Sequence, residues 1–256
     1  MRNKDNYILK PVFYIIFIIF TYFPSLNGSR QALAAAVVFF ASKYILERKF
    51  WVFFIWVLVA ISFHYSSVVL LLLYFVVTKE FNRITMLTIL FLSFFLSQIG
   101  FFSFILEYIL LNYGFLDIGG YIENYLYSSY NSREIEFGIV FYINTFILIL
   151  FIILKKRLII NEKMEVTFNF FYLYILTYIL SMDAPMLTRL TYFFSIYMAI
   201  CIPAFGQLFK SEDKKLVNYI LIMLYSILFL FVLMNGYLNP SQLDYVPYNY
   251  NFNIIK

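Results

Sequence analysis

The sequence has little of what a soluble or metal-dependent enzyme needs. Only 13% of its 256 residues are charged, whereas soluble domains carry about 25%. A single cysteine, Cys201, excludes an internal disulfide, and a single histidine excludes a zinc site built from several Cys and His ligands. There is no Gly-rich phosphate loop, Gly-x-Ser-x-Gly elbow or Asp-x-Asp motif. Metal-dependent chemistry is therefore disfavoured, and we expect neither a metal nor a cofactor.

Apolar residues dominate instead. They make up 63% of the chain, with 33 Phe and 24 Tyr, against about 45–50% in soluble proteins. Runs near the roughly 20 residues that cross a bilayer fall at about 11–25, 31–46, 50–77, 84–103, 138–154, 167–182, 186–206 and 216–235. These runs predict an all-α polytopic membrane protein, with a single transmembrane domain over residues 1–256.

The run 50–77 decides the topology, because it is long and carries Ser62-Phe63-His64-Tyr65-Ser66-Ser67 in its middle. If it turns back on itself and the N-terminus is inside, 15 of the 19 basic residues become cytoplasmic, as the positive-inside rule prefers. If it crosses once, the cluster Lys155-Lys156-Arg157 falls outside. We therefore predict about nine crossings, the N-terminus in and the C-terminus out, a short hairpin at 50–77 and an external loop at about 104–137. The start of this loop, 102–111, could form an amphipathic surface helix.

Two further features have simple membrane explanations. The net charge of +5 follows from basic residues in cytoplasmic loops, and no nucleic-acid motif or basic face is present, so no nucleic-acid partner is expected. Residues 11–23 resemble a secretory signal in hydrophobicity, but no small-residue cleavage site follows them. We interpret this segment as the first membrane helix.

Three polar residues stand at predicted helix starts on the external side. Arg30 opens the second apolar run, His64 lies at the hairpin apex, and Arg189 follows Asp183-Ala184-Pro185 in the first turn of its helix. An arginine at a helix N-terminus opposes the helix dipole. An anion such as phosphate, held between helix N-termini and guanidinium groups, would explain two of them. The simpler alternatives are a packing histidine, arginines that reach toward headgroups and an Asp183 that only caps a helix.

Four short motifs occur in an order that suggests a family. They are Asn27-Gly28-Ser29-Arg30-Gln31-Ala32-Leu33-Ala34, Ala60-Ile61-Ser62-Phe63-His64-Tyr65-Ser66-Ser67, Arg189-Leu190-Thr191-Tyr192-Phe193 and Tyr245-Val246-Pro247-Tyr248-Asn249-Tyr250. Together they resemble the EpsG family of Wzy-like polysaccharide polymerases, over about residues 25 to 250. The resemblance implies several more helices upstream of the first motif, so we expect this chain to be short at its N-terminus compared with its relatives.

The resemblance implies a GT-C-like, metal-independent glycosyltransferase in the bacterial inner membrane. Its substrate would be an undecaprenyl-pyrophosphate-linked oligosaccharide, polymerised at the outer leaflet into capsule, exopolysaccharide or O-antigen. Its partners would be the lipid bilayer and other polysaccharide export proteins. By motif, Arg30 and Arg189 would hold the donor pyrophosphate, and His64 would activate the acceptor hydroxyl or orient the donor phosphate. The residues expected to support substrate binding are Gln31, Tyr192 and Asp183.

Two other functions stay open at this point. A membrane acyltransferase that modifies the same polysaccharide would also use a membrane-embedded His and Arg, but it would need His64 accessible from the cytoplasm. A transporter or flippase of lipid-linked sugars usually has pseudo-repeated halves, and the sequence shows none.

Overall fold

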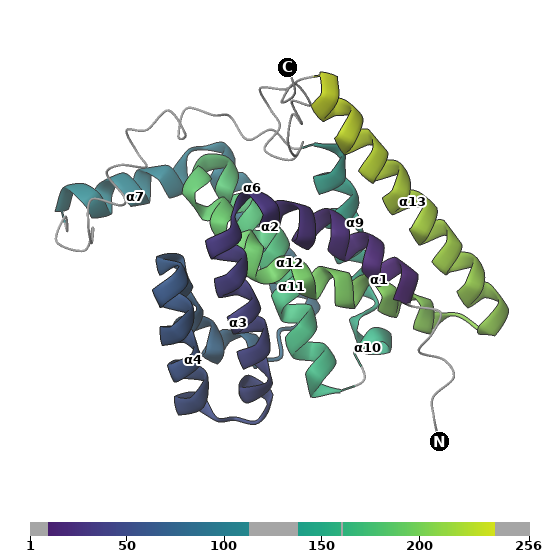
Figure 1. The fold of residues 1–256 in the computed structure, drawn as a ribbon, viewed down its shortest axis with the longest axis horizontal. Coiled ribbons are helices and arrows are strands. Elements are labelled where there is room, and N and C mark those ends of the chain that lie inside the picture. The colour runs from purple at the N-terminus through teal and green to yellow at the C-terminus, as the bar shows by residue number, and fades with distance from the viewer. Residues whose placement is uncertain (1–9, 113–137, 160, 239–256) are drawn as a thin grey trace, which may run out of the picture.

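The computed structural model describes residues 10–112, 138–159 and 161–238, and every regular element in them is helical (Figure 1). The all-α class is therefore confirmed. The main helices are α1 (Lys10–Phe17), α2 (Phe23–Asn27), α3 (Ser29–Leu46), α4 (Phe50–Phe63), α5 (Leu70–Val77), α6 (Arg83–Gln98), α7 (Phe101–Asn112), α9 (Ile139–Ile153), α11 (Glu162–Asp183), α12 (Thr188–Cys201) and α13 (Ser211–Leu238). Shorter elements are the π-helical η2 (Ile18–Tyr22), α10 (Lys155–Leu158) and the 3₁₀ turns η3 (Tyr65–Val69), η5 (Pro185–Leu187) and η6 (Ile202–Leu208).

Every predicted apolar run contains a helix, and several are long enough for a membrane. By length and composition, three helical stretches of the described chain could cross a bilayer, at Glu162–Asp183, Pro185–Gly206 and Asp213–Phe231. A fourth arises if α6 and the start of α7, bent by 73°, form one span. Other helices also expose apolar side chains: Trp51 of α4, Leu72 of α5 and Phe91 of α6 are each at least 70% exposed. Exposing so much apolar surface to water is unfavourable, whereas its contact with lipid tails is not.

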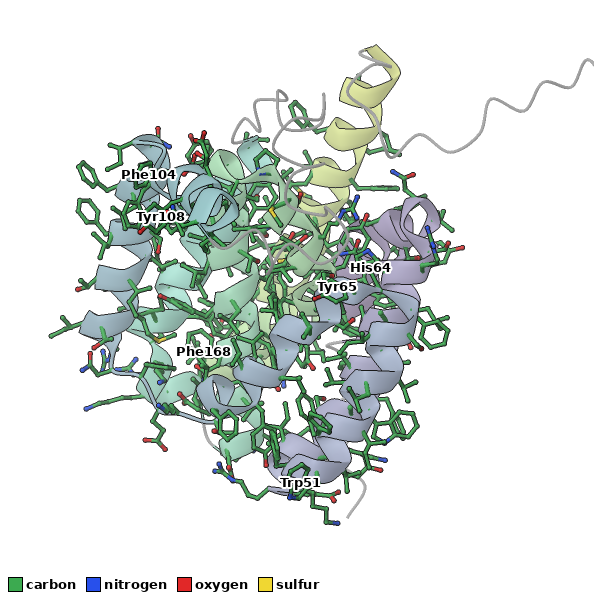
Figure 2. All side chains as sticks on the ribbon, turned by 90° about the vertical axis from the view of Figure 1, so that its left-hand side faces the viewer. Trp51, His64, Tyr65, Phe104, Tyr108 and Phe168 are labelled. Atoms are coloured by element: carbon green, nitrogen blue, oxygen red, sulfur yellow. The ribbon has the colours of Figure 1, made fainter. Side chains whose placement is uncertain are left out.

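The segment 50–77 folds back on itself, as predicted. Helix α4 ends at Phe63, His64 takes an extended conformation (φ −151°, ψ 119°), and η3 leads into α5. The Tyr74 ring near the end of α5 lies 5.1 Å from Phe50 and 5.4 Å from Phe53 at the start of α4, between ring centroids. His64 is thus at one end of the hairpin and Trp51 at the other (Figure 2).

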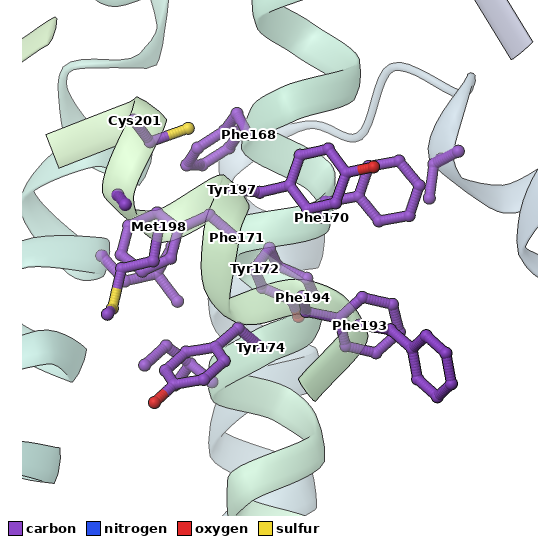
Figure 3. Close-up of a cluster of buried hydrophobic side chains, with 14 of the residues drawn as sticks. Phe168, Phe170, Phe171, Tyr172, Tyr174, Phe193, Phe194, Tyr197, Met198 and Cys201 are labelled. Atoms are coloured by element: carbon purple, nitrogen blue, oxygen red, sulfur yellow. The ribbon is translucent and has the colours of Figure 1, made fainter. Parts of the chain in front are cut away.

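Helices α11 and α12 form the centre of the molecule (Figure 1). The most apolar stretch of α11 is 72% buried, compared with 22% for α13. Aromatic side chains fill the contact between α11 and α12 (Figure 3), and the rings of Phe170 and Tyr197 stack at 4.1 Å. Stacked aromatics combine a large buried area with a defined geometry. Helix α12 packs along α11, and Arg189 lies in the first turn of α12.

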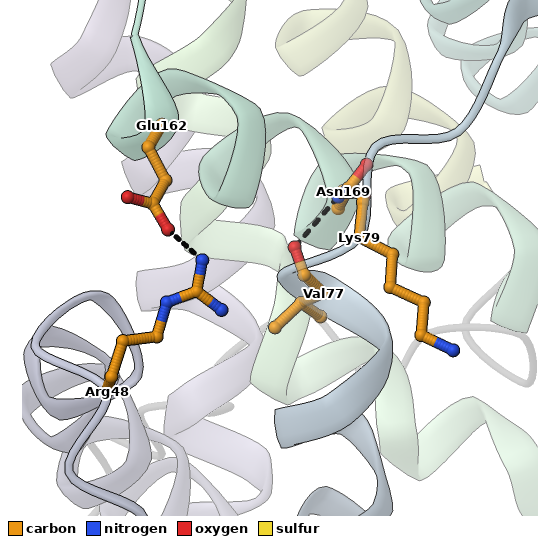
Figure 4. A network of polar contacts seen from close by, with 5 residues as sticks. All are labelled: Arg48, Val77, Lys79, Glu162 and Asn169. Atoms are coloured by element: carbon orange, nitrogen blue, oxygen red, sulfur yellow. Dashed lines mark hydrogen bonds and ion pairs between the residues drawn. The ribbon is translucent and has the colours of Figure 1, made fainter.

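Loops that the charge rule places in the cytoplasm meet at one end of the bundle. The Arg48 guanidinium, after α3, pairs with Glu162 at the start of α11 (Figure 4). The Asn169 side-chain amide donates hydrogen bonds to the carbonyls of Val77 (2.8 Å) and Lys79 (2.9 Å), at the end of the hairpin. Both contacts require the chain to return to the same end after α4 and α5, which a single crossing at 50–77 would not allow.

The loop after α9 joins the same group. Lys155 Nζ lies 2.5 Å from Glu165 Oε1 and donates to the carbonyl of Phe81 at 2.6 Å. Arg83 Nη1 donates to the carbonyl of Ile153 at 2.8 Å. In addition, η6 contacts both α10 and α1, so the segment before α13 also lies here. We call this end, defined by Arg48, Lys79, Arg83 and Lys155, the basic end.

Candidate functional site

The starts of α3 and α12 pack against each other at the end opposite the basic end. The Gln31 side-chain amide, which is buried, donates a hydrogen bond to the carbonyl of Arg189. A Cβ on Gly28 would lie 3.1 Å from Tyr192 Cε1, so glycine permits this close approach. The Tyr192 hydroxyl donates to the carbonyl of Pro24 at 3.4 Å. Gln31 and Tyr192 therefore hold Arg30 and Arg189 at neighbouring helix starts.

Neither of these helix starts has a side-chain cap. Gly28 precedes α3 and Ala184 precedes η5, and no side-chain hydrogen bond caps either element. Arg30, the second residue of α3, is exposed and has no ion pair or hydrogen bond with another residue in the described ranges. Uncapped backbone N–H groups beside a guanidinium favour an anion.

His64 brings the third helix start to this site. Its half-buried ring has Nδ1 2.8 Å from Ser66 Oγ, and the backbone N–H of Ser66 donates to the same nitrogen at 3.4 Å. Helix α3 packs along α4, so Arg30 at the start of α3 and His64 at the end of α4 lie at the same end, and the start of α12 with Arg189 packs against α3. The three residues that the sequence singled out thus converge in space.

Asp183, the last residue of α11, binds the start of another helix. It does not cap the helix that follows it; its carboxylate accepts hydrogen bonds from the backbone N–H groups of Phe102 (2.6 Å) and Ser103 (3.1 Å), and from the Ser103 hydroxyl. It therefore caps α7, about 80 residues earlier in the chain. Gly100, with φ +75°, makes the bend between α6 and α7 that this cap stabilises. The alternative role of Asp183 as a helix cap is thus present, on α7, and its expected part in substrate binding stays a prediction.

The predicted surface segment 102–111 is helical and coincides with α7. Phe104 and Tyr108 are 62% and 52% exposed on it (Figure 2). The rest of the predicted external loop, 113–137, and the aromatic tail motif at 245–250 lie outside the described residues. Within the described ranges, no group of three or more His, Cys, Asp and Glu side chains could hold a metal ion. Arg30 and Arg189 carry positive charge at this site.

A comparison with protein-family models matches the EpsG family over residues 1–250. The chain belongs to the EpsG family. Separate comparisons with curated proteins and with solved structures gave no match. Membership confirms the resemblance seen in the four motifs, and it assigns the chain a polymerase-like role in polysaccharide biosynthesis at a membrane.

In this EpsG-family chain, the sequence motifs identified the charged residues but not every residue that places them. Ser66 belongs to the quoted hairpin motif, yet its bond to His64 depends on the extended conformation of His64 and could not be seen in the sequence. The serine-rich composition at 62–67 was the available signal. No sequence pattern pointed to Pro24, whose carbonyl accepts a hydrogen bond from the Tyr192 hydroxyl.

Proposed function

We propose that this protein polymerises undecaprenyl-pyrophosphate-linked oligosaccharide units at the outer leaflet of the bacterial inner membrane. The product would be a capsule, exopolysaccharide or O-antigen chain. The observation that carries the proposal is the convergence of Arg30, His64 and Arg189 at three helix starts, at the end opposite the basic end. Because basic loops stay in the cytoplasm, the three residues would face the outside, where the lipid-linked units are joined.

The reaction moves the growing glycan from its lipid carrier to an incoming unit. The bond between the anomeric carbon and the pyrophosphate oxygen breaks, and a bond to an acceptor hydroxyl oxygen forms. The leaving lipid pyrophosphate keeps the electron pair, and the proton of the acceptor hydroxyl passes to a pyrophosphate oxygen or to water. Negative charge therefore grows on a phosphate oxygen as the bond breaks. Arg30 and Arg189 would stabilise that charge, and the N-terminus of α3, which has no side-chain cap, would add to it.

Gln31 and Tyr192 would serve this chemistry by fixing the distance between the two arginines. Gln31 binds the Arg189 backbone, and Tyr192 fills the space beside Gly28. A transfer site needs its charged groups held in place before the substrate arrives. Asp183 would contribute by holding α7 beside the site through its cap.

The fold expected for this function is GT-C-like, with about nine crossings and the N-terminus in the cytoplasm. The acyltransferase alternative would need His64 accessible from the cytoplasm. A cysteine at position 64 separates the two. In intact cells, a membrane-impermeant maleimide should label His64→Cys from outside, whereas labelling only in inverted vesicles would favour the acyltransferase. Cys201 is buried and gives little background.

The test of the polymerase is polymer length in cells that carry Arg30→Ala, His64→Ala or Arg189→Ala. We expect each variant to accumulate single lipid-linked units and to lose long chains, while its membrane level stays normal. Lys156→Ala, an exposed substitution at the basic end, is the matched control and should leave chain length unchanged. Normal long chains in all three site variants would contradict the proposal. Export of single units without elongation would instead support the transporter.

A further inference from the structure

His64 makes its closest side-chain contact with a residue only two positions along the chain. Ser66 Oγ lies 2.8 Å from Nδ1, and the Ser66 backbone N–H donates to that nitrogen at 3.4 Å. A backbone N–H is always a donor, so Nδ1 acts here as an acceptor. A neutral imidazole carries one proton, which must then be on Nε2.

Hydrogen bonds also fix the backbone of His64. Its backbone N–H donates to the carbonyl of Ala60 at 3.0 Å. Its own carbonyl accepts from the Ser67 backbone N–H at 3.1 Å and from the Ser67 hydroxyl at 2.8 Å. With the backbone fixed on both sides, the orientation of the ring depends on the contact with Ser66. Nε2 is then the one ring nitrogen left for a ligand.

We propose that Ser66 is a positioning residue that keeps the proton of His64 on Nε2, so that His64 meets the substrate as a hydrogen-bond donor. This inference rests on the proposed function. An Nε2–H group cannot take the proton of an acceptor hydroxyl, but it can donate to a phosphate oxygen. Of the two roles open to His64, orienting the donor phosphate is the one assigned. Arg30 and Arg189 lie at the same end of the bundle as His64 and would attract the same anionic oxygens.

The chain has a single histidine, so ¹⁵N-histidine labelling reports on His64 alone. The measurement is an ¹⁵N NMR spectrum of the full chain in lipid at about pH 8, where imidazole is normally neutral. We expect Nδ1 to show the shift of an unprotonated nitrogen and Nε2 that of a protonated one. A proton on Nδ1, or the mixture that free imidazole shows, would overturn the inference.

Variants of Ser66 distinguish a role in positioning His64 from a role in folding alone. Ser66→Ala should mix the two tautomers and slow polymer elongation about fivefold to tenfold, the loss expected of one hydrogen bond. Ser66→Thr keeps the hydroxyl and should restore both readouts. Ser62→Ala is the matched control, because the Ser62 hydroxyl binds the Val59 carbonyl on the same hairpin. An unchanged tautomer in Ser66→Ala would overturn the role of Ser66.

The two readouts keep this inference distinct from the proposed function. The tautomer is measured without substrate, so it does not depend on polymerisation. If the arginine variants all elongate normally, the polymerase proposal fails and the tautomer result still stands. If Nδ1 is protonated while the arginine variants are inactive, the polymerase stands and Ser66 loses its role.

Discussion

At the basic end, cationic side chains face carboxylates and backbone carbonyls of the same chain. Arg48 pairs with Glu162, and Lys155 lies against both Glu165 and the carbonyl of Phe81. At the opposite end, Arg30 meets no acidic side chain among the described residues, and the nearby carboxylate, Asp183, binds the start of α7. The first arrangement uses charge to hold loops together. The second leaves positive charge for an anion that is not part of the protein.

Charges at the two ends of the bundle therefore have different roles: those at the basic end stabilise the fold, and those at the other end serve the proposed activity. Charges that satisfy each other locally should matter for folding and little for activity. Charges without an internal partner cost little to remove from the fold, because nothing is left unpaired. Removing a charge at the basic end should therefore lower stability and spare activity. Removing Arg30 at the site end should lower activity and spare stability.

The largest effect on stability is expected at the basic end, from Lys155→Ala. The substitution leaves the Glu165 carboxylate, whose side chain is only 10% exposed, without its counter-charge. Losing one partner of a buried pair costs about 3 kcal/mol or more. Thermal unfolding in detergent should show a clearly lower Tm.

Two matched variants sharpen this prediction. Lys156→Ala removes an exposed neighbour and should leave the Tm nearly unchanged. The double variant Lys155→Met with Glu165→Leu removes both charges and should recover most of the loss. If Lys155→Ala were no more harmful than Lys156→Ala, the pair would not hold the basic end together.

Gly28→Ala, at the site end, should lower stability less than Lys155→Ala does, and it should clearly lower activity. The added Cβ would lie 3.1 Å from Tyr192 Cε1, so the ring or α3 must shift. Crowding of this kind costs about 1 kcal/mol or more. Because α3 carries Arg30, polymer chains should become shorter.

The control for Gly28→Ala is Gly138→Ala. A Cβ on Gly138 would meet nothing within 4 Å, so both stability and polymer length should stay normal. Adding Tyr192→Leu to Gly28→Ala should relieve the crowding and restore part of the activity. Identical behaviour of the two glycine variants would show that the close approach of α3 and α12 is not needed.

Much of this architecture could be predicted from the sequence because it follows from charge and hydrophobicity alone. The distribution of Lys and Arg predicts the turn at His64, and the contact of Phe50 with Tyr74 agrees with it. The convergence of Arg30, His64 and Arg189 follows from that turn.

The remaining features depend on contacts between distant parts of the chain. Ser97, Gln98 and Gly100 interrupt the apolar run 84–103, but these residues alone do not predict a bend. That bend depends on a positive φ and on Asp183, which caps α7 from another helix. The bond from Gln31 to the Arg189 carbonyl spans 158 positions. Such pairings are set by packing, which local sequence patterns do not encode.

The different roles of the two ends are tested most directly by measuring the elongation rate and the Tm of the purified Arg30→Ala and Arg48→Ala proteins in lipid. Arg30→Ala should elongate a lipid-linked oligosaccharide about 100-fold more slowly, with little change in Tm, because it removes a charge that stabilises the leaving pyrophosphate and that pairs with no acidic side chain of the described residues. Arg48→Ala loses an exposed ion pair, so it should elongate normally and lose at most about 1 kcal/mol of stability. Equal elongation rates in the two variants would contradict the account.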